Sequence, residues 1–342
     1  MDRRRIQRFV CKSCGRTFSQ QSFACSYYLK RPELLVPIAA GLNAGSAHRQ
    51  VARSLGCAGS TVTRQSQRLG RHAMLLHAET LTHLPVIEEP VVFDHFETFV
   101  CSHWDRVAVA TPVGKDSWFV YGLQPAPHRR SGRVSPYQEK KRKQQKVPPP
   151  PPGQVTESTR WVLDLLAAKA PAEGQVHLIS DGHKAYEQVL SKHPAALRFV
   201  HHIHPNPQRG PKGAPRSKEA CQRDHVMFAV DLLHKLWRHS SASHKRKTFA
   251  FARRANAIVE RGYLFAIWRN LIKGSSERRP DPSTPAMRLG LTDVPWTWQR
   301  VLSRRLFPAR VVKPPGLMTL YRRNLVTPAV GINVQHTLKR AF

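Results

Sequence analysis

Hydrophobic and polar positions change their period several times along the chain, and each change indicates a different kind of element. From Pro90 onward, β-branched and aromatic residues gather in short runs bounded by turn formers, a pattern typical of strands. We expect these runs to form successive antiparallel strands: VVFDHFETFV (91–100), RVAVATPV (106–113) and SWFVYGL (117–123).

Helices and strands alternate in the next part of the domain. Trp161, Leu165 and Leu166 share one face of a helix predicted over 156–170. The elements expected after it are a strand over 176–180 (VHLIS), a helix over about 183–192 and a strand over 197–203. Three strands followed by this alternation predict an α/β fold with a mixed sheet.

Helical periodicity also precedes and follows these strands, whereas the last part of the chain, from Gly274 on, is proline-punctuated and basic, and its pattern predicts no architecture. Two further helical stretches are expected over 224–239 and 244–273. We divide the chain into a partial zinc ribbon (1–30), a helical DNA-binding domain (31–85), an α/β catalytic domain (86–275) and a basic C-terminal extension (276–342).

One stretch inside the α/β domain breaks its pattern. Residues 125–155 carry the basic run KKRK at 140–143 and five consecutive prolines at 148–152. Because proline removes a hydrogen-bond donor and fixes φ, we expect an exposed, basic insertion or flexible loop here. Its charge run could contact DNA phosphates, although a solvated surface is the ordinary role of such a run.

Charge is the feature of composition that changes the picture most. The 342 residues are 41% hydrophobic, which is enough for two or three domains, but 55 lysines and arginines face only 22 acids, a formal charge of +33. Such a surface calls for a polyanion, above all nucleic acid. No stretch is long and apolar enough for a membrane span and the first ten residues lack a signal-peptide core, so we expect a cytoplasmic, nucleoid-associated protein.

Two short motifs near the N-terminus fit DNA-binding modules. The first, FVCKSCGRTFS (9–19), places Cys11 and Cys14 in a C-x-x-C-G knuckle, a geometry that lets two thiolates reach one zinc ion. A second C-x-x-C is absent, so either the chain starts inside the ribbon, or Cys25 and a histidine complete the site, or the thiols bind nothing.

The second motif, HRQVARSLGCAGSTVTRQSQRL (48–69), has the spacing of a helix-turn-helix. Ala52, Gly56 and Val62 supply a small residue where two helices touch, a glycine for the turn and an apolar anchor for the second helix. That helix is expected to start near Ser60. It would expose five groove-reading side chains: Thr61, Thr63, Arg64, Gln65 and Arg68. An ordinary helical hairpin is the alternative.

Scarce carboxylates carry the catalytic hypothesis. Asp94 lies in the first predicted strand, and Asp181 ends the strand VHLIS directly before a glycine. Carboxylates are costly in apolar surroundings unless a cation pairs with them, so two on neighbouring strands indicate a metal site. We expect the third acid to be Glu260, on the helix RKTFAFARRANAIVERGYLFAIWRNLIKG (246–274), with Asn256 on the same face to orient it or to contact DNA.

Asp94, Asp181 and Glu260 would hold two Mg²⁺ ions, with Mn²⁺ as a substitute, for in-line displacement at phosphorus. Each acid also has an ordinary structural role open to it. Asp181 could cap a helix, Asp94 could pair with a cation, and Glu260 could bridge to arginines of its own helix. The competitors for these positions are Glu97, Asp105, Asp224 and Asp231.

A histidine group after the last predicted strand is a rival metal site. His201, His202 and His204 lie close together, and His183 follows Asp181. The pattern H-H-x-H on a strand points its side chains to different faces, so we interpret these histidines as contacts to DNA or to the metal ligands rather than as a zinc site.

The order of these parts resembles bacterial insertion-sequence transposases of the DDE type, which join a zinc ribbon and a helix-turn-helix to an RNase H-like catalytic domain. The resemblance covers about residues 9–275 and is carried by FVCKSCGRTFS, the helix-turn-helix, FDHFETF with Asp94, LISDGHKAY with Asp181, and RRANAIVERGYLFAIWRNLIKG with Glu260. It implies an RNase H-like fold, magnesium, terminal inverted repeats and target sites as the double-stranded DNA that is bound, and a homo-oligomer on that DNA.

Three functions remain open at this point. The resemblance favours a transposase that cleaves DNA by water attack and then joins the freed 3′ hydroxyl to a target. A catalytically inactive, transposase-derived DNA-binding protein would show salt-sensitive binding without cleavage. A weaker alternative is an RNase H-like nuclease acting on RNA hybrids.

Overall fold

A five-stranded mixed sheet forms the centre of the protein. The computed structural model describes residues 6–22, 24–129, 134–144, 148–208, 210–211, 213–278 and 280–337. The strands stand in the order β5-β4-β3-β6-β7. Their bounds are β3 Val91–Val100, β4 Ser102–Gly114, β5 Gln124–Arg129, β6 Val176–Ser180 and β7 Phe199–Ile203. The α/β fold with a mixed sheet is thus confirmed.

Strand directions divide this sheet into two halves that meet at β3. β4 runs antiparallel to β3 and β5, whereas β6 is parallel to both β3 and β7. The predicted strands over 91–100, 106–113, 176–180 and 197–203 are therefore confirmed, with β4 beginning four residues earlier than expected.

The third antiparallel strand is not where the sequence predicted it. Residues 117–123 are buried but irregular, with a tight turn at Trp118 (φ 63°) and a single bridge between Val113 and Val120. The side-chain amide of Asn270 accepts a hydrogen bond from the N–H of Val120 and donates one to its carbonyl, at 2.9 and 3.0 Å. The N–H of Tyr121 donates to the carbonyl of Pro112 at 3.0 Å, so the segment folds back on the end of β4, and the regular strand β5 forms from 124–129.

The stretch 125–155 is more ordered than expected. It begins with β5, continues with α4 (Pro136–Gln144), which contains the KKRK run, and leads through its prolines to α5 (Gln154–Ala167). Among the described residues of this stretch, the prolines at 148–152 keep the irregular backbone that the sequence predicted.

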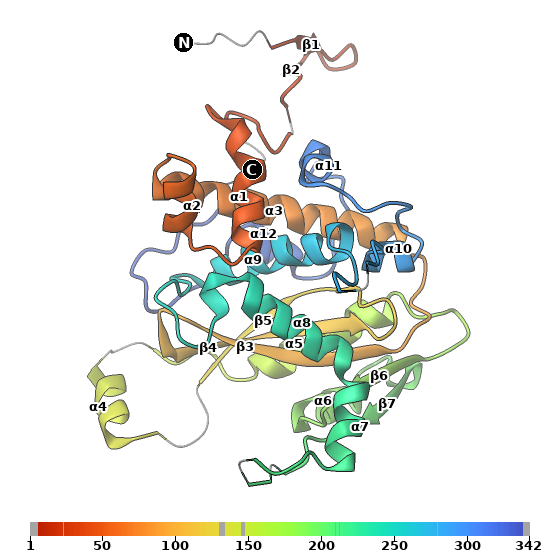
Figure 1. The fold of residues 1–342 in the computed structure, drawn as a ribbon. Helices are drawn as coiled ribbons and strands as arrows, with labels where there is room; N and C mark the ends of the chain where they lie inside the picture. The colour runs from red at the N-terminus through yellow and green to blue at the C-terminus, as the bar shows by residue number, and fades with distance from the viewer. Residues whose placement is uncertain are drawn as a thin grey trace.

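Helices cover both faces of the sheet (Figure 1). Side chains alternate along β3, so His95 meets Ser158 of α5 and Tyr186 of α6, whereas Phe96 stacks on Trp237 of α8 on the opposite face. The helices of this part are α6 Lys184–Leu190, α7 Lys218–Val226, α8 Phe228–Ser240 and α9 Ala255–Ile267, which continues as a π-helical turn, Trp268–Ile272.

Two predicted helices have different bounds in the structure. The helix expected over 224–239 is divided at Met227, where α7 ends and α8 begins. The helix expected over 244–273 begins only at Ala255, because residues 245–254 form an irregular segment joined to the end of β3 by a bridge between Val100 and Ala252.

The N-terminal helices pack directly on the α/β core and share its hydrophobic interior. They are α1 Leu35–Asn43, α2 His48–Ser54 and the long α3 Gly59–His83, which lies along α9. One continuous hydrophobic core runs from Cys25 to Tyr321. The C-terminal extension adds three short helices to it: α10 Pro285–Arg288, α11 Trp298–Ser303 and α12 Leu317–Tyr321.

Candidate functional site

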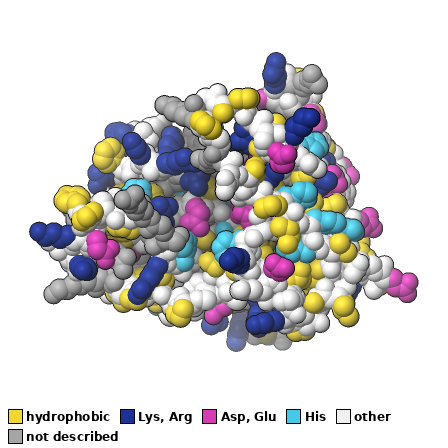
Figure 2. Space-filling model, turned by 90° about the horizontal axis from the view of Figure 1, so that it is seen from below, with side chains coloured by type: hydrophobic (Ala, Val, Ile, Leu, Met, Phe, Trp, Pro, Cys, Tyr) yellow, Lys and Arg dark blue, Asp and Glu magenta, His cyan; other side chains and the backbone are white. Residues whose placement is uncertain are grey.

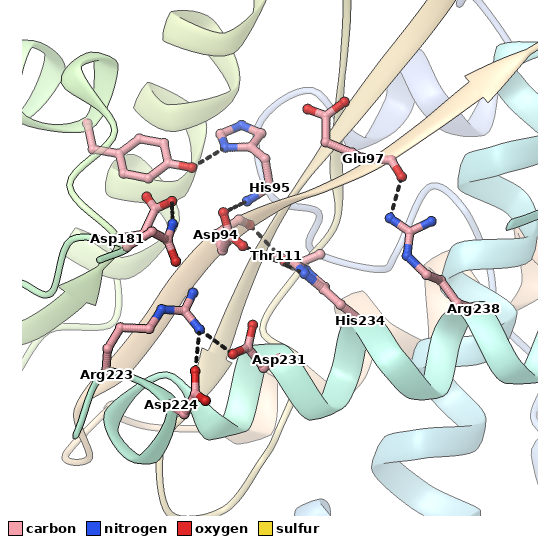
Figure 3. A network of polar contacts seen from close by, with 12 residues as sticks. Asp94, His95, Glu97, Thr111, Asp181, Arg223, Asp224, Asp231, His234 and Arg238 are labelled. Carbon is pink, nitrogen blue, oxygen red and sulfur yellow. Dashed lines mark hydrogen bonds and ion pairs between the residues drawn. The ribbon is translucent and has the colours of Figure 1, made fainter. Parts of the chain in front are cut away.

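Two acids lie side by side because of the register of the central parallel strands. β3 and β6 pair with Phe93 opposite Ser180. Asp94 and Asp181 are the residues that follow these two on the adjacent strands. Neighbouring strands lie about 4.8 Å apart, and Figure 3 shows the two side chains next to each other. The structure therefore brings together two of the three acids that the sequence analysis selected.

The electrostatics of Asp94 reflect this closeness. Burial, and after it the negative charge of Asp181, raises the pKa of Asp94 to about 7. The backbone N–H of His95 donates a 2.7 Å hydrogen bond to Asp94 Oδ1, which opposes the shift. A cation beside the pair would favour the charged carboxylates, since opposite charge lowers the pKa of an acid.

Two hydrogen bonds fix the carboxylate of Asp181, one from the loop after β6 and one from the side chain of Asn206. The N–H of His183 donates to Asp181 Oδ1 at 3.2 Å, and Asn206 Nδ2 donates to Asp181 Oδ2 at 3.1 Å. The N-cap of α6 is His183, whose ring nitrogen accepts from the N–H of Ala185. Asp181 is therefore not the helix cap that was its structural alternative.

A histidine of α8 occupies the other side of Asp94. His234 Nδ1 lies 3.7 Å from Asp94 Oδ2, and its Nε2 lies 2.7 Å from the hydroxyl of Thr111, which itself donates to the Asp94 carbonyl. Because the hydroxyl proton is used on that carbonyl, Nε2 carries the ring proton and Nδ1 presents a lone pair to Asp94. Burial lowers the pKa of His234 to about 3, so the ring is neutral.

Asp231, a further acid of α8, also influences the pKa of Asp94. Its charge raises the pKa of Asp94, and that of Arg223 lowers it. Arg223 forms ion pairs with Asp231 and, at 3.6 Å, with Asp224, and Figure 3 shows it between Asp181 and α8. Asp231, which the sequence analysis ranked below Glu260, therefore belongs to the charged surroundings of Asp94.

Behind Asp94, on the opposite face of β3, buried polar groups fix the strand. His95 Nδ1 lies 2.7 Å from the hydroxyl of Tyr186, and its Nε2 lies 2.9 Å from the hydroxyl of Ser158. Burial lowers the pKa of His95 to about 3, so these contacts are between neutral groups. Burial and the charge of Asp94 raise the pKa of Tyr186, which keeps its hydroxyl protonated.

Glu260 is not part of this group, and the expectation of a triad through it is corrected. The Glu260 side chain is 1% exposed and faces two arginines, with its Oε1 2.8 Å from Arg323 Nε and 3.7 Å from Arg71 Nη1. Its backbone packs so closely on α3 that a Cβ at Gly70 would lie 2.5 Å from it. The buried face of α9 therefore meets α3, not the edge of the sheet.

Asn256 shares this structural environment. Its Nδ2 donates to the carbonyl of Leu325 at 2.8 Å, and its Oδ1 accepts from the N–H of the same residue at 3.3 Å. Asn256 thus holds the C-terminal segment onto α9. The i, i+4 spacing that placed it with Glu260 was correct, but the shared face is buried away from the aspartates.

The other competing acids have partners of their own. Glu97 points to the opposite side of β3 from Asp94, 3.4 Å from His128 Nε2, and Asp105 accepts from the hydroxyl of Ser102 at 3.1 Å. Within the residues that the structure describes, no three His, Cys, Asp or Glu side chains are grouped closely enough to hold a metal ion. The donor set that fits a hard divalent cation is the oxygen pair of Asp94 and Asp181.

The helix-turn-helix has the backbone that its sequence predicted. α2 ends at Ser54, Gly56 adopts φ 56° in the turn, and α3 starts at Gly59, with Ala52 and Val62 buried between the helices. Arg64 is exposed and Thr61 partly exposed. The remaining three of the five expected DNA-reading side chains are also partly exposed, and two of them, Thr63 and Arg68, form hydrogen bonds within the protein.

Arg68 joins α3 to the N-terminal segment, because its Nη1 donates to the carbonyls of Cys25 and Tyr27 at 2.9 and 2.7 Å. Thr63 bonds to the ring of His48 at 3.0 Å and to the carbonyl of Gly59. The Oε1 of Gln65 is buried.

The cysteine knuckle forms a small hairpin of β1 (Arg8–Val10) and β2 (Thr17–Ser19) with Cys11 and Cys14 at its turn. Hydrogen bonds from Ser13 and Cys14 lower the pKa of Cys11 to about 7, which favours the thiolate that binds zinc. Cys25 is fully buried in the helical core and burial raises its pKa to about 12, so it does not complete this site.

The histidines after β6 and on β7 point to different faces, as expected. His201 lies 2.9 Å from the hydroxyl of Ser180, whereas His202 stacks on His177 with a nitrogen–nitrogen distance of 3.0 Å. Acidic and histidine side chains lie near the middle of the face in Figure 2, with lysines and arginines around them.

Comparison with models of known protein families and with curated proteins finds no match to this chain. Among the described residues, no helix combines the length and the hydropathy that a membrane span requires.

Proposed function

We propose that this protein is a DNA strand-cleaving and strand-joining enzyme of the DDE transposase type, and that Asp94 and Asp181 form its metal-binding pair. The observation that carries this proposal is the register of β3 and β6, which aligns two carboxylates from distant parts of the sequence. Burial and repulsion between these two charges raise the pKa of Asp94, so the pair is suited to a cation.

Each residue around the pair has a distinct role in this proposal. Asp94 and Asp181 would hold magnesium, with manganese as a substitute, and the metal would supply charge stabilisation at the attacked phosphate. The Thr111 hydroxyl fixes the backbone of Asp94 by donating to its carbonyl, and neutral His234 lies beside the carboxyl group without neutralising it. Asp231 lies where a third carboxylate could act once Arg223 moves toward DNA phosphates.

The rest of the molecule is consistent with DNA as the substrate. A formal charge of +33 favours a polyanion, and the helix-turn-helix backbone presents Arg64 to solvent. The mixed sheet with helices on both faces supports the RNase H-like fold that the resemblance implies. The same proposal has three further parts. The DNA that is bound is the ends of the insertion sequence, the protein binds these ends as a homo-oligomer, and Cys11 and Cys14 bind zinc.

A second candidate, a DNA-binding protein without catalysis, is favoured by one specific observation. The expected third acid, Glu260, is buried against Arg71 and Arg323, and Asp231 is paired with Arg223. If neither acid reaches the pair, the protein would bind DNA in a salt-dependent manner without cutting it.

The test is a magnesium-dependent cleavage assay on DNA that carries the inverted repeats flanking the gene. Asp94→Asn and Asp181→Asn are expected to abolish nicking while DNA binding persists. Asp164→Asn is the matched control, because Asp164 is a half-exposed acid of α5 that pairs with His193 at 3.1 Å. Nicking that survives Asp181→Asn would refute the assignment, and binding without nicking by the unaltered protein would favour the second candidate.

A further inference from the structure

A large cavity separates the helix-turn-helix from the α/β core, away from the two aspartates. Its volume is about 730 Å³, within the range of pockets that hold small ligands. One wall is formed by the start of α2 and the first turns of α3, including Gly59, Ser60 and Thr63. The other wall is the irregular segment 241–254 with the first turns of α9.

Positive charge dominates the lining of this cavity. Its charged side chains are one acid, Glu260, and five arginines: Arg49, Arg253, Arg254, Arg261 and Arg323. Glu260 is already engaged with Arg323 and with Arg71 behind it, so the arginines outnumber the acid by four. Burial, and after it the charge of Arg261, lowers the pKa of His48, which also lines the cavity, to about 4.

An aromatic ring stands at the same cavity. Phe249 lines it and is fully exposed to solvent (106%), an unusual position for a phenylalanine in a segment with no helix or strand around it. Its segment, SASHKRKTFAFARR (241–254), contains five lysines and arginines and no acid. Exposed aromatic rings among basic side chains are typical of surfaces that bind unpaired nucleotides, because every base has a face that can stack.

The segment that carries Phe249 is fixed to the strand that carries Asp94. His244 Nδ1 lies 2.9 Å from the hydroxyl of Thr98 on β3. The N–H of Cys101, directly after β3, donates to the carbonyl of Ala252 at 2.8 Å. Within the segment, the hydroxyl of Thr248 donates to the carbonyl of Ala242 at 2.8 Å. The ring is therefore presented by an ordered loop.

We propose that this cavity binds one unpaired nucleotide of DNA, with its phosphate against Arg253 and Arg261 and its base stacked on Phe249. The proposal rests on the proposed function for its source of nucleotides, since DNA bound by α3 would pass the cavity mouth. A free nucleoside monophosphate has the same chemistry, a phosphate with an attached base, and is the other source that the test must separate.

The experiment uses the full chain without divalent metal, so that it does not depend on cleavage. One probe is a short duplex with a single unpaired 2-aminopurine, a second is the same duplex fully paired, and a third is free 2-aminopurine monophosphate. Stacking on Phe249 is expected to quench the unpaired base and to tighten binding of the first duplex roughly tenfold over the second. Quenching of the free monophosphate at equal affinity would instead identify a small-molecule site and overturn the DNA assignment.

Three variants at the cavity and one control variant make the result specific. Phe249→Ala should remove most of the difference between the two duplexes, whereas Phe249→Tyr should keep it because the ring is retained. Arg253→Gln, at the exposed rim of the cavity, should reduce the slope of log affinity against log salt by about 0.7–0.9. Phe228→Ala is the matched control, since Phe228 is an exposed phenylalanine outside the cavity.

Phe249→Ala that binds and quenches like the unaltered protein would overturn the proposal, as would an equal loss of affinity for both duplexes. Failure of the proposed function looks different. A protein that never cleaves DNA but shows the Phe249-dependent preference for the unpaired nucleotide would retain this site and lose only the catalytic assignment.

Discussion

Replacement of Glu260 by glutamine separates the two possible roles of this acid. In the structure its carboxylate lies 2.8 Å from Arg323 Nε and 3.7 Å from Arg71 Nη1, with 1% of the side chain exposed. Glutamine has nearly the same shape but no charge, so two buried guanidinium groups would lose their counter-charge. We therefore expect a loss of stability and no direct loss of chemistry.

The size of the loss follows from this geometry. Removing one partner of a buried ion pair costs about 3–5 kcal/mol, because the other charge stays buried without compensation. Burial raises the pKa of Glu260 to about 7 in spite of the arginines, so the carboxylate is only partly favoured at neutral pH. We expect the lower end, about 3 kcal/mol, against a typical stability of about 5–15 kcal/mol. Most molecules would still fold.

The assay pairs urea unfolding, followed by tryptophan fluorescence, with cleavage activity per folded molecule. Glu260→Gln should be destabilised and active, and Asp181→Asn should be inactive with unchanged or higher stability, since it removes repulsion from Asp94. Arg323→Gln, which removes the other partner of the pair, should resemble Glu260→Gln. A Glu260→Gln protein that is as stable as the original but cleaves nothing would refute this reasoning and restore the triad.

Three further outcomes are expected. Burial lowers the pKa of His77 to about 4 from an ordinary value near 6.5, so its contribution to stability is present above pH 6.5 and is lost as the pH falls toward 4. His77→Gln should therefore remove up to about 3 kcal/mol of the acid sensitivity that urea unfolding measures. Equal pH dependence of stability in the two proteins would contradict this prediction. Arg68→Ala removes two hydrogen bonds to the carbonyls of Cys25 and Tyr27 and should cost about 1–3 kcal/mol, with faster proteolysis before α1 as the measurement. At Gly182 the backbone has φ 79°, and the Cβ of an alanine there would lie 2.6 Å from Ile203 Cγ2. Gly182→Ala should therefore cost about 1–2 kcal/mol of stability. Cleavage should also weaken, because the loop that holds Asp181 must move.

Local patterns were sufficient for much of this protein. Runs of β-branched and aromatic residues bounded by turn formers identified β3, β4, β6 and β7, and the isolated acids of two apolar runs identified Asp94 and Asp181. The spacing of Ala52, Gly56 and Val62 located the α2–α3 turn. These features depend on residues a few positions apart, so the chain shows them directly.

The sequence did not predict which surfaces the elements pack against. Glu260 and Asn256 share a helix face, as their spacing requires, but the sequence could not tell whether that face meets the aspartates or α3. The strand-like residues 117–123 fold back on the end of β4, where the N–H of Tyr121 donates to the carbonyl of Pro112. Asn270, far along the chain, bonds both backbone groups of Val120, and the regular strand forms from 124–129. His234 had no local signal at all, since only the docking of α8 on β3 places it beside Asp94.

The sequence by itself therefore determined the kinds of elements, the excess of positive charge and the two acids of the parallel strands. Only the tertiary structure decided which side chains surround those acids, which arginines are committed to the interior, and that a basic cavity opens beneath Phe249. The physical reason is that periodicity arises from neighbouring residues, whereas burial and pairing of a charge depend on the elements that pack against it.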